Sequence, residues 1–204
     1  VETPLQRRDA AAVGQALYER FVAKRHVLRL KAQGADWQAH ARQNDVLLSW
    51  LRRSEDPWLR EVYEGIEAAY LREVRRFVEE QIAPRAFAID EMDIGMMDLY
   101  EAMAQAGLIG TQFRQVDGGV GLSSKASLRV NAMAAEASSG VTLAALNVLG
   151  SLVPDMLVRR LDNPAADAQR HRVLVGILHG EMVGNYALTA PEGPFIEKPA
   201  PPTL

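Results

Sequence analysis

The sequence predicts a mainly α-helical protein in which β-structure begins only near the end of the chain. Over most of the 204 residues, apolar side chains recur at steps of three and four, the spacing of helices that bury one face. Glycine and proline separate these stretches at the places where helices are expected to end. The segment VGNYALTAPEGP (183–194) instead has the pattern of a strand that enters a polar turn, with no partner strand expected after it.

Composition and charge exclude several classes of protein. The chain contains no cysteine, which rules out a disulfide framework, thiolate catalysis and cysteine-ligated metal sites, and which fits a reducing compartment. A net charge of −3 gives no argument for nucleic-acid binding. No uncharged apolar run approaches the ~20 residues of a membrane-spanning helix, and the amino terminus lacks the apolar core of a signal peptide. We expect a soluble cytoplasmic protein without a transmembrane segment, and because the first residue is valine we expect its natural start to lie upstream.

Residues 1–56 form a basic helical extension in this interpretation. Lysine and arginine exceed aspartate and glutamate by five in residues 1–53, whereas the remainder of the chain carries a charge of −8. We expect two helices, the first with an apolar stripe that ends at a glycine, the second with an N-cap aspartate and two tryptophans. Their defining residues are Val13, Leu17, Phe21, Leu28 and Gly34 for the first, and Asp36, Trp37 and Trp50 for the second. We expect a packing appendage or an oligomer arm; the alternative is a basic helix that binds an acidic surface, an RNA or a membrane face.

Residues 57–181 are expected to be a succession of helices that forms the main domain. The first, WLREVYEGIEAAYLREVRRFVEEQIAP, has its apolar residues at helical steps and is expected to end before Pro84. The second, MMDLYEAMAQAG, is closed by Gly107 and is followed by a glycine-punctuated loop. The third lies within SSKASLRVNAMAAEASS and begins at capping serines.

Two further helical stretches complete this domain. GVTLAALNVLGSLVPDMLVRRL is nearly all apolar and is expected to be a buried helix pair, bent near Gly150 and Pro154. The last helix opens at Asn163 and Pro164, as cap and first-turn residue, and stops at Gly180.

Several motifs are candidate sites, but a structural role is the preferred interpretation for each. GGVGL (118–122) resembles a phosphate loop, yet it lacks the P-loop lysine and a preceding strand, so a structural turn is expected. Glu136 lies on an apolar helical face and is expected to be a hydrogen-bonded structural glutamate; the alternative is a buried acid. His171 and His179 have no carboxylate that would complete a metal site. A methionine cluster could line an acyl-chain channel, although core packing is preferred; its members are Met92, Met96, Met97 and Met103.

Four motifs in sequence order give the chain a resemblance to a known family. RRFVEEQIAPRAFAID, LYEAMAQAGLIG, VDGGVGLSS and ILHGEMVGNYALTAPEG follow one another between residues 57 and 193. Each is weak alone, but together they resemble the amino-terminal half of the acyl-CoA dehydrogenase family, with its I-x-P, GL-x-G, GG-x-G and SGE…ALTEP motifs. The resemblance implies a helical bundle over 57–181. It also implies that the chain ends at the first strand of a mostly absent β-barrel domain, within 182–204 and ahead of a proline-rich tail.

The resemblance also implies an activity. Members of the family use FAD to dehydrogenate the α,β bond of an acyl-CoA thioester, and they pass the electrons to an electron-transferring flavoprotein. We therefore expect a flavoprotein oxidoreductase of fatty acid metabolism, either a homo-oligomer or paired with a homologous subunit. The family's catalytic carboxylate comes from a carboxy-terminal domain that this sequence does not include, so no residue of this chain is nominated as the catalytic base.

Site residues are carried over from the family by position. Thr189 would hydrogen-bond the flavin, with Tyr186 and Leu188 beside it. Acyl contacts are expected from the apolar stretch 141–149, namely from Val141, Leu143, Leu146 and Leu149. The family sequence TEPGAGSD is altered here, with Ala190 at its glutamate and Phe195 at its serine. This fits a changed substrate, a weakened flavin site, or a chain break that joins unrelated residues.

Two alternatives to a dehydrogenase remain open. One is a flavin-dependent monooxygenase of the same fold, which would be distinguished by residues of the carboxy-terminal half. The other is a non-catalytic helical interaction module that binds no flavin and pairs with a full-length homologue.

Overall fold

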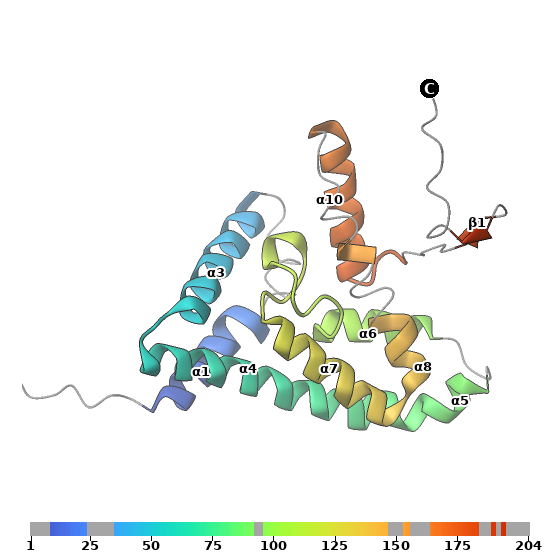
Figure 1. The fold of residues 1–204 in the computed structure, drawn as a ribbon, viewed down its shortest axis with the longest axis horizontal. Helices are drawn as coiled ribbons and strands as arrows, with labels where there is room; N and C mark the ends of the chain where they lie inside the picture. Colours follow the sequence, from blue (N-terminus) through green and yellow to red (C-terminus); the bar gives the residue numbers. More distant parts are fainter. Residues whose placement is uncertain are drawn as a thin grey trace, which may run out of the picture.

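The computed structural model describes residues 9–23, 35–91, 96–146, 153–155, 164–183, 189–190 and 193–194. These residues are mostly helical, which confirms the predicted fold class (Figure 1). The α-helices are α1 (Ala10–Tyr18), α3 (Ala35–Arg53), α4 (Pro57–Phe77), α5 (Ala86–Asp90), α6 (Met97–Ala106), α7 (Ser124–Ala137), α8 (Ser139–Val141) and α10 (Pro164–Leu178). Short π- and 3-10 helices are η1 (Glu19–Ala23), η2 (Val78–Ile82), η3 (Ala83–Arg85) and η4 (Gln115–Asp117).

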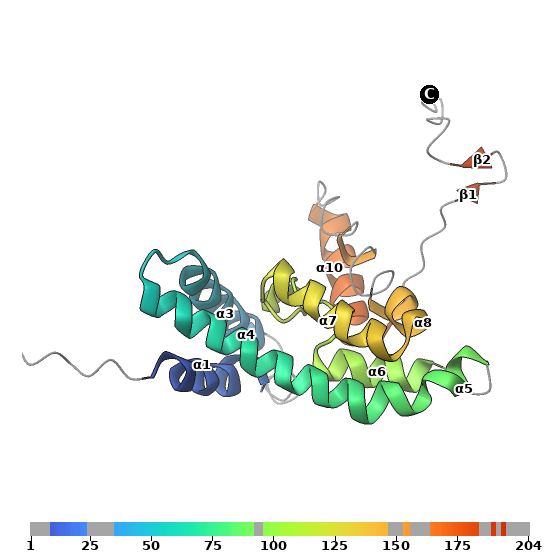
Figure 2. The same cartoon turned by 60° about the horizontal axis from the view of Figure 1, so that its bottom comes forward.

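The long helix α4 is the axis of the described structure. Helices α1 and α3 lie against its amino-terminal half, and α7 lies against its carboxy-terminal part (Figures 1 and 2). The carboxylate of Asp56 accepts the backbone N–H groups of Trp58 (2.8 Å) and Leu59 (3.4 Å), so it caps the first turn of α4, where Pro57 needs no donor. Regular α-geometry ends at Phe77, but η2, η3 and α5 continue the helical path through Pro84, where we expected the helix to stop. Pro84 lies in the first turn of η3, a position that tolerates the missing N–H.

Helix α1 approaches α4 closely because two glycines face each other. A Cβ atom added to Gly14 would lie 2.6 Å from the carbonyl oxygen of Val62 and 2.7 Å from the Cα of Gly65. The buried residues of α1 and η1 are Ala10, Gly14, Tyr18 and Val22.

This buried face is displaced by one residue from the predicted stripe. The predicted Val13, Leu17 and Phe21 are only partly buried, because small residues occupy the closest contact line between the helices. The remaining residues of the prediction, Leu28 and Gly34, lie outside the described part of the chain.

Helix α3 packs against both α4 and η4. It begins at Ala35, so Asp36 lies inside the helix and the prediction that Asp36 is its N-cap is wrong. Leu48 and Leu51 are buried, whereas Trp50 is 53% exposed and lies on the outer face. Residues of α1, η1 and α3 thus share one hydrophobic core with α4.

The helices and turns from α6 to α7 confirm the local predictions. Gly107 closes α6 in the left-handed region, with φ of 86°. Ser123 caps α7 by accepting the backbone N–H of Ala126 at 3.1 Å. The loop between the two helices contains η4 and is held by turns at Gly118 (φ 98°) and Gly121 (φ 84°), which confirms a structural turn in GGVGL.

The carboxy-terminal elements are α10 and a short hairpin. Helix α10 ends at Leu178, followed by Gly180 with φ of 76°, close to the predicted stop. Strand β1 (Thr189–Ala190) pairs antiparallel with β2 (Gly193–Pro194), so Thr189 has a partner strand after it, contrary to our expectation. Most of the predicted helix pair around Gly150, together with Asn163 and the tail, lies outside the described residues.

None of the helices in the described ranges is both long and apolar enough to cross a membrane.

Candidate functional site

The predicted acyl-contact residues divide into buried and exposed positions. Val141 and Leu146 are 0% and 2% exposed and belong to the hydrophobic core. Leu143, between them, is 63% exposed, because residues 142–146 continue the helix from α8 and direct successive side chains to different faces. Leu149 lies outside the described residues. Leu143 is therefore the described member of this group that has surface available for a ligand, and its role in acyl binding stays a prediction.

Of the three predicted flavin contacts, the structure describes one, Thr189. Thr189 begins strand β1, opposite Pro194 in the two-stranded ladder. Tyr186 and Leu188 lie outside the described residues. The assignment of these three residues to FAD stays a prediction.

A polar network connects α3 with the glycine loop between α6 and α7. One carboxylate oxygen of Asp45 accepts the backbone N–H of Gln115 at 2.7 Å, and the other accepts that of Val116 at 3.0 Å. Burial raises the pKa of Asp45 above 3.8, although these two hydrogen bonds act in the opposite direction. Asp45 therefore caps a helical turn that lies seventy residues away in the sequence.

Two buried amides reinforce this contact. The side-chain amide of Asn44 donates to Gln115 Oε1 at 2.9 Å, and Gln115 Nε2 donates to the carbonyl oxygens of Phe21 (3.0 Å) and Val120 (3.1 Å). Asn44 and Gln115 are only 8% and 4% exposed, so these bonds satisfy polar groups that water does not reach. The end of η1, α3 and the glycine loop are thereby joined in one network.

Two histidines connect the same loop with α10. His171 Nε2 lies 3.2 Å from the carbonyl oxygen of Val116 and 3.6 Å from Asp117 Oδ1. His179 Nε2 lies 3.0 Å from the carbonyl oxygen of Gly118. Asp117 is also held by Arg114, whose Nε lies 2.7 Å from Asp117 Oδ2, and this bond raises the pKa of Arg114. In the described part of the chain, no three histidine, aspartate or glutamate side chains are placed to hold a metal ion.

The end of α10 is also held by α6. The hydroxyl of Tyr100 donates to the carbonyl oxygen of Ile177 at 2.9 Å, and burial raises the pKa of Tyr100 to about 12. A Cβ atom on Gly180 would lie 3.0 Å from the Cα of Glu101, so the turn after α10 lies directly on α6. The last turn of α10 is thus fixed from two sides before the chain continues toward Thr189.

Among the described residues the buried glutamate is Glu67, not Glu136. Glu136 is exposed on α7, so the expectation of a structural glutamate within the apolar face is wrong. Glu67 is 7% exposed, and its carboxylate accepts the backbone N–H of Ser123 at 3.2 Å. Burial, with the neighbouring Glu67 carboxylate as a second cause, raises the pKa of Tyr63. The burial of Glu67 could have been predicted from its position on the apolar stripe of α4, four residues after Tyr63. No feature of the sequence near Asp45 indicates its contact with the glycine loop.

The methionine cluster divides in the same way as the acyl-contact residues. Met103 is fully buried and Met96 packs against the core, as the preferred interpretation expects, but Met97 is 56% exposed. Met92 lies outside the described residues.

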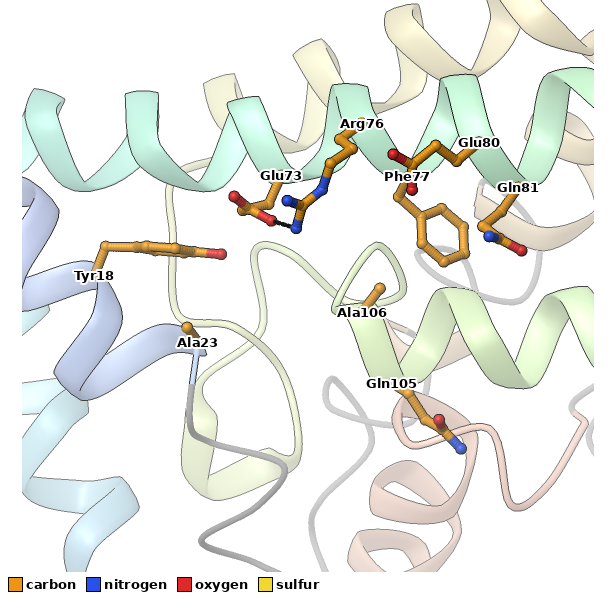
Figure 3. Close-up of a pocket in the computed structure, with 9 residues that line it drawn as sticks. All are labelled: Tyr18, Ala23, Glu73, Arg76, Phe77, Glu80, Gln81, Gln105 and Ala106. Carbon is orange, nitrogen blue, oxygen red and sulfur yellow. Dashed lines mark hydrogen bonds and ion pairs between the residues drawn. The ribbon is translucent and has the colours of Figure 1, made fainter.

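An open pocket of about 390 Å³ lies between the end of η1, α4 with η2, and the end of α6 (Figure 3). Its lining is Tyr18, Ala23, Glu73, Arg76, Phe77, Glu80, Gln81, Gln105 and Ala106. Arg76 is paired with Glu73, and the ring of Tyr18 extends toward this pair (Figure 3). Its walls combine charged and amide side chains with the apolar surfaces of two aromatic rings and two alanines, so the lining does not favour a polar molecule over an acyl chain. None of the predicted flavin or acyl residues lines this pocket.

Comparison with known proteins shows which family this chain belongs to. The family model of the acyl-CoA dehydrogenase N-terminal domain matches residues 67–181, from α4 through the glycine loop and α7 to the end of α10. The chain is also similar to a protein of Clostridium acetobutylicum described as "acyl-CoA dehydrogenase, short-chain specific". They are 29% identical over 118 residues, which cover 58% of this chain and 30% of that protein, so the similarity spans less than a third of the relative. Because the family model covers more than half of the sequence, the chain belongs to the acyl-CoA dehydrogenase family, through that family's N-terminal domain.

Proposed function

We propose that this protein takes part in the FAD-dependent α,β-dehydrogenation of an acyl-CoA thioester. The observation that carries the proposal is the match of residues 67–181 to the family's N-terminal domain, with its helices and glycine loop in the expected order. The electrons would pass to an electron-transferring flavoprotein. The assembly would be a homo-oligomer or a pair with a homologous subunit, and the absence of cysteine supports a location in the reducing cytoplasm.

The chain's own contribution to this reaction would be to bind and orient. FAD would supply the acceptor of the hydride from the β-carbon. The backbone and hydroxyl of Thr189 would hydrogen-bond the flavin, with Tyr186 and Leu188 beside it. The exposed side chain of Leu143 would contact the acyl chain, while Val141 and Leu146 support it from the core.

Removal of the α-proton is assigned to no carboxylate of this chain. Glu67, the buried glutamate of the described residues, accepts a hydrogen bond at the start of α7, where it serves the fold. The base would have to come from the family's carboxy-terminal domain.

Substitution of Leu143 by serine tests the acyl contact. In an assembly that contains the family's carboxy-terminal domain, Leu143→Ser should raise KM for long acyl-CoA substrates by about tenfold and leave kcat within about twofold, because an apolar contact to the chain is lost without a change in the reacting atoms. Leu128→Ser on α7 is the matched control, because this leucine is also exposed, at 69%. Equal KM values for the two variants at every chain length would contradict the assignment.

One sequence feature favours a second candidate function. Ala190 and Phe195 replace the glutamate and serine of the family's flavin segment, which fits a helical subunit that binds no flavin and pairs with a complete homologue. That candidate predicts a colourless protein that forms a stable complex with a flavin-containing subunit. A purified protein with bound FAD would contradict it.

A further inference from the structure

Helix α3 lies outside the stretch that matches the family, which begins at Glu67, yet it contacts the glycine loop inside that stretch. We infer that Asp45 is a positioning residue: through η4 it holds the carboxy-terminal half of α10, from which the chain continues toward Thr189. A residue of the N-terminal extension would then help to hold part of the family's domain in place, whereas the sequence alone indicates an appendage.

The first step of the coupling is the contact between Asp45 and η4. The carboxylate holds the backbone N–H groups of Gln115 and Val116 at 2.7 and 3.0 Å, one on each oxygen. Hydrogen bonds from backbone amides to a carboxylate are among the stronger ones in proteins. The side chain of Asn44, one residue earlier, donates to the Gln115 side chain, so two consecutive residues of α3 fix the position and orientation of this turn.

The second step is the contact between η4 and α10. The same residue whose N–H binds Asp45, Val116, offers its carbonyl oxygen to His171 at 3.2 Å. Two residues later, the carbonyl oxygen of Gly118 meets His179 at 3.0 Å. His171 lies on α10 and His179 follows the last residue of that helix, eight positions later, so the loop contacts this segment at two points more than two helical turns apart.

A direct contact between the two helices runs beside this path. The rings of Trp37 on α3 and His179 after α10 form an edge-to-face pair with centroids 6.3 Å apart. A displacement of η4 would therefore also alter the environment of His179 from the α3 side. Helix α6 also holds the end of α10, independently of Asp45 and η4, because the hydroxyl of Tyr100 donates to the carbonyl oxygen of Ile177 at 2.9 Å.

Amide hydrogen exchange on the full chain tests whether Asp45 acts on α10 or only on its immediate partners. Asp45→Ala should increase the exchange rates of amides in 115–121 and in 175–182 by about tenfold, because the two carboxylate bonds that hold η4 are lost. Asp45→Asn keeps one acceptor oxygen and should give a smaller increase in both segments. The asparagine variant also provides the measurement if the alanine variant does not fold.

Asp56→Ala is the matched control. Asp56 also accepts two backbone N–H groups at the start of a helix, at 2.8 and 3.4 Å, but its partners belong to α4 and not to the glycine loop. It should accelerate exchange in the first turn of α4 and leave 175–182 unchanged.

Two results would overturn the inference. One is unchanged exchange in 175–182 when Asp45 is replaced, which would mean that α6 alone holds α10. The other is an equal increase there for Asp45→Ala and Asp56→Ala, which would reflect only a general loss of stability. The experiment uses neither FAD nor acyl-CoA, so its outcome is independent of the proposed function.

Discussion

Replacement of Gly14 by alanine should destabilise the protein, although alanine normally stabilises a helix. In an ordinary helix interior, glycine to alanine is favourable by about 0.5–1 kcal/mol. At Gly14 the new methyl group would lie 2.6 Å from the carbonyl oxygen of Val62 and 2.7 Å from the Cα of Gly65, both of which are backbone atoms of α4.

The expected magnitude follows from this distance. Because packed heavy atoms meet at about 3.5–4.0 Å, α1 must retreat by roughly 1 Å, and no side-chain rotation can relieve the clash. Overpacking of this kind costs about 1–3 kcal/mol, and the retreat also weakens the burial of Tyr18 and Val22. We expect Gly14→Ala to lower the free energy of unfolding by about 2 kcal/mol.

Urea denaturation monitored by helical circular dichroism measures this change. The facing Gly65→Ala is the control: its Cβ would lie 3.2 Å from the Cα of Gly14, so a shift of a few tenths of an ångström accommodates it. We expect the control to lose less than about half as much free energy of unfolding as Gly14→Ala. A Gly14→Ala protein as stable as the wild type would refute the close packing of α1 on α4.

The remaining predictions concern the end of α10, a buried hydroxyl and an acidic group. Gly180→Ala should lower the melting temperature, because φ of 76° costs an alanine about 1–2 kcal/mol and the Cβ of that alanine would lie 3.0 Å from the Cα of Glu101. An unchanged melting temperature would contradict this turn geometry. Tyr70→Phe should cost about 1–3 kcal/mol in chemical denaturation, because the buried hydroxyl contacts Thr111 Oγ1 at 2.8 Å, and a neutral effect would mean that water replaces it. The pKa of Asp45 is raised in the folded state, so the folded protein binds this proton more tightly than the unfolded chain does. The contribution of Asp45 to stability therefore falls as pH rises above 3.8 through the folded pKa. Asp45→Asn removes this titration. As pH rises over that range, the urea midpoint of the wild type should therefore fall relative to that of the variant. A constant difference between the two midpoints would contradict the raised pKa of Asp45.

Signals that lie within one helix or turn were predictable from the sequence. Gly107 as the end of α6 and Ser123 as the cap of α7 depend on neighbouring residues, and both predictions are confirmed. The buried stripe of α1 was displaced by one residue because large apolar residues guided the prediction. The contact with α4 instead depends on the absence of a side chain at Gly14.

Features that depend on distant partners could not be predicted. The cap that Asp45 provides for η4 joins residues seventy positions apart, and the sequence around Asp45 contains no sign of it. Burial of Glu67 and exposure of Glu136 follow from which helix packs on which, and both glutamates lie in apolar-looking helices.

The candidate site was predictable only as far as the family resemblance extends. The order of the motifs predicted the family, which the family model confirms. The assignment of acyl contacts to the stretch 141–149 stays a prediction. Whether a given leucine in it faces the core or the solvent depends on the rotation of a helix that begins at Ser139, and that rotation separates Leu143 from Val141 and Leu146.

The most direct test of the central claim is the visible absorption spectrum of the purified protein, recorded before and after anaerobic addition of an acyl-CoA. The account predicts the absorption of bound FAD, and it predicts bleaching by acyl-CoA when the family's catalytic domain is present in the same assembly. A colourless protein that takes up no added FAD would contradict the dehydrogenase proposal, and would leave the chain as a helical subunit of the family without the family's chemistry.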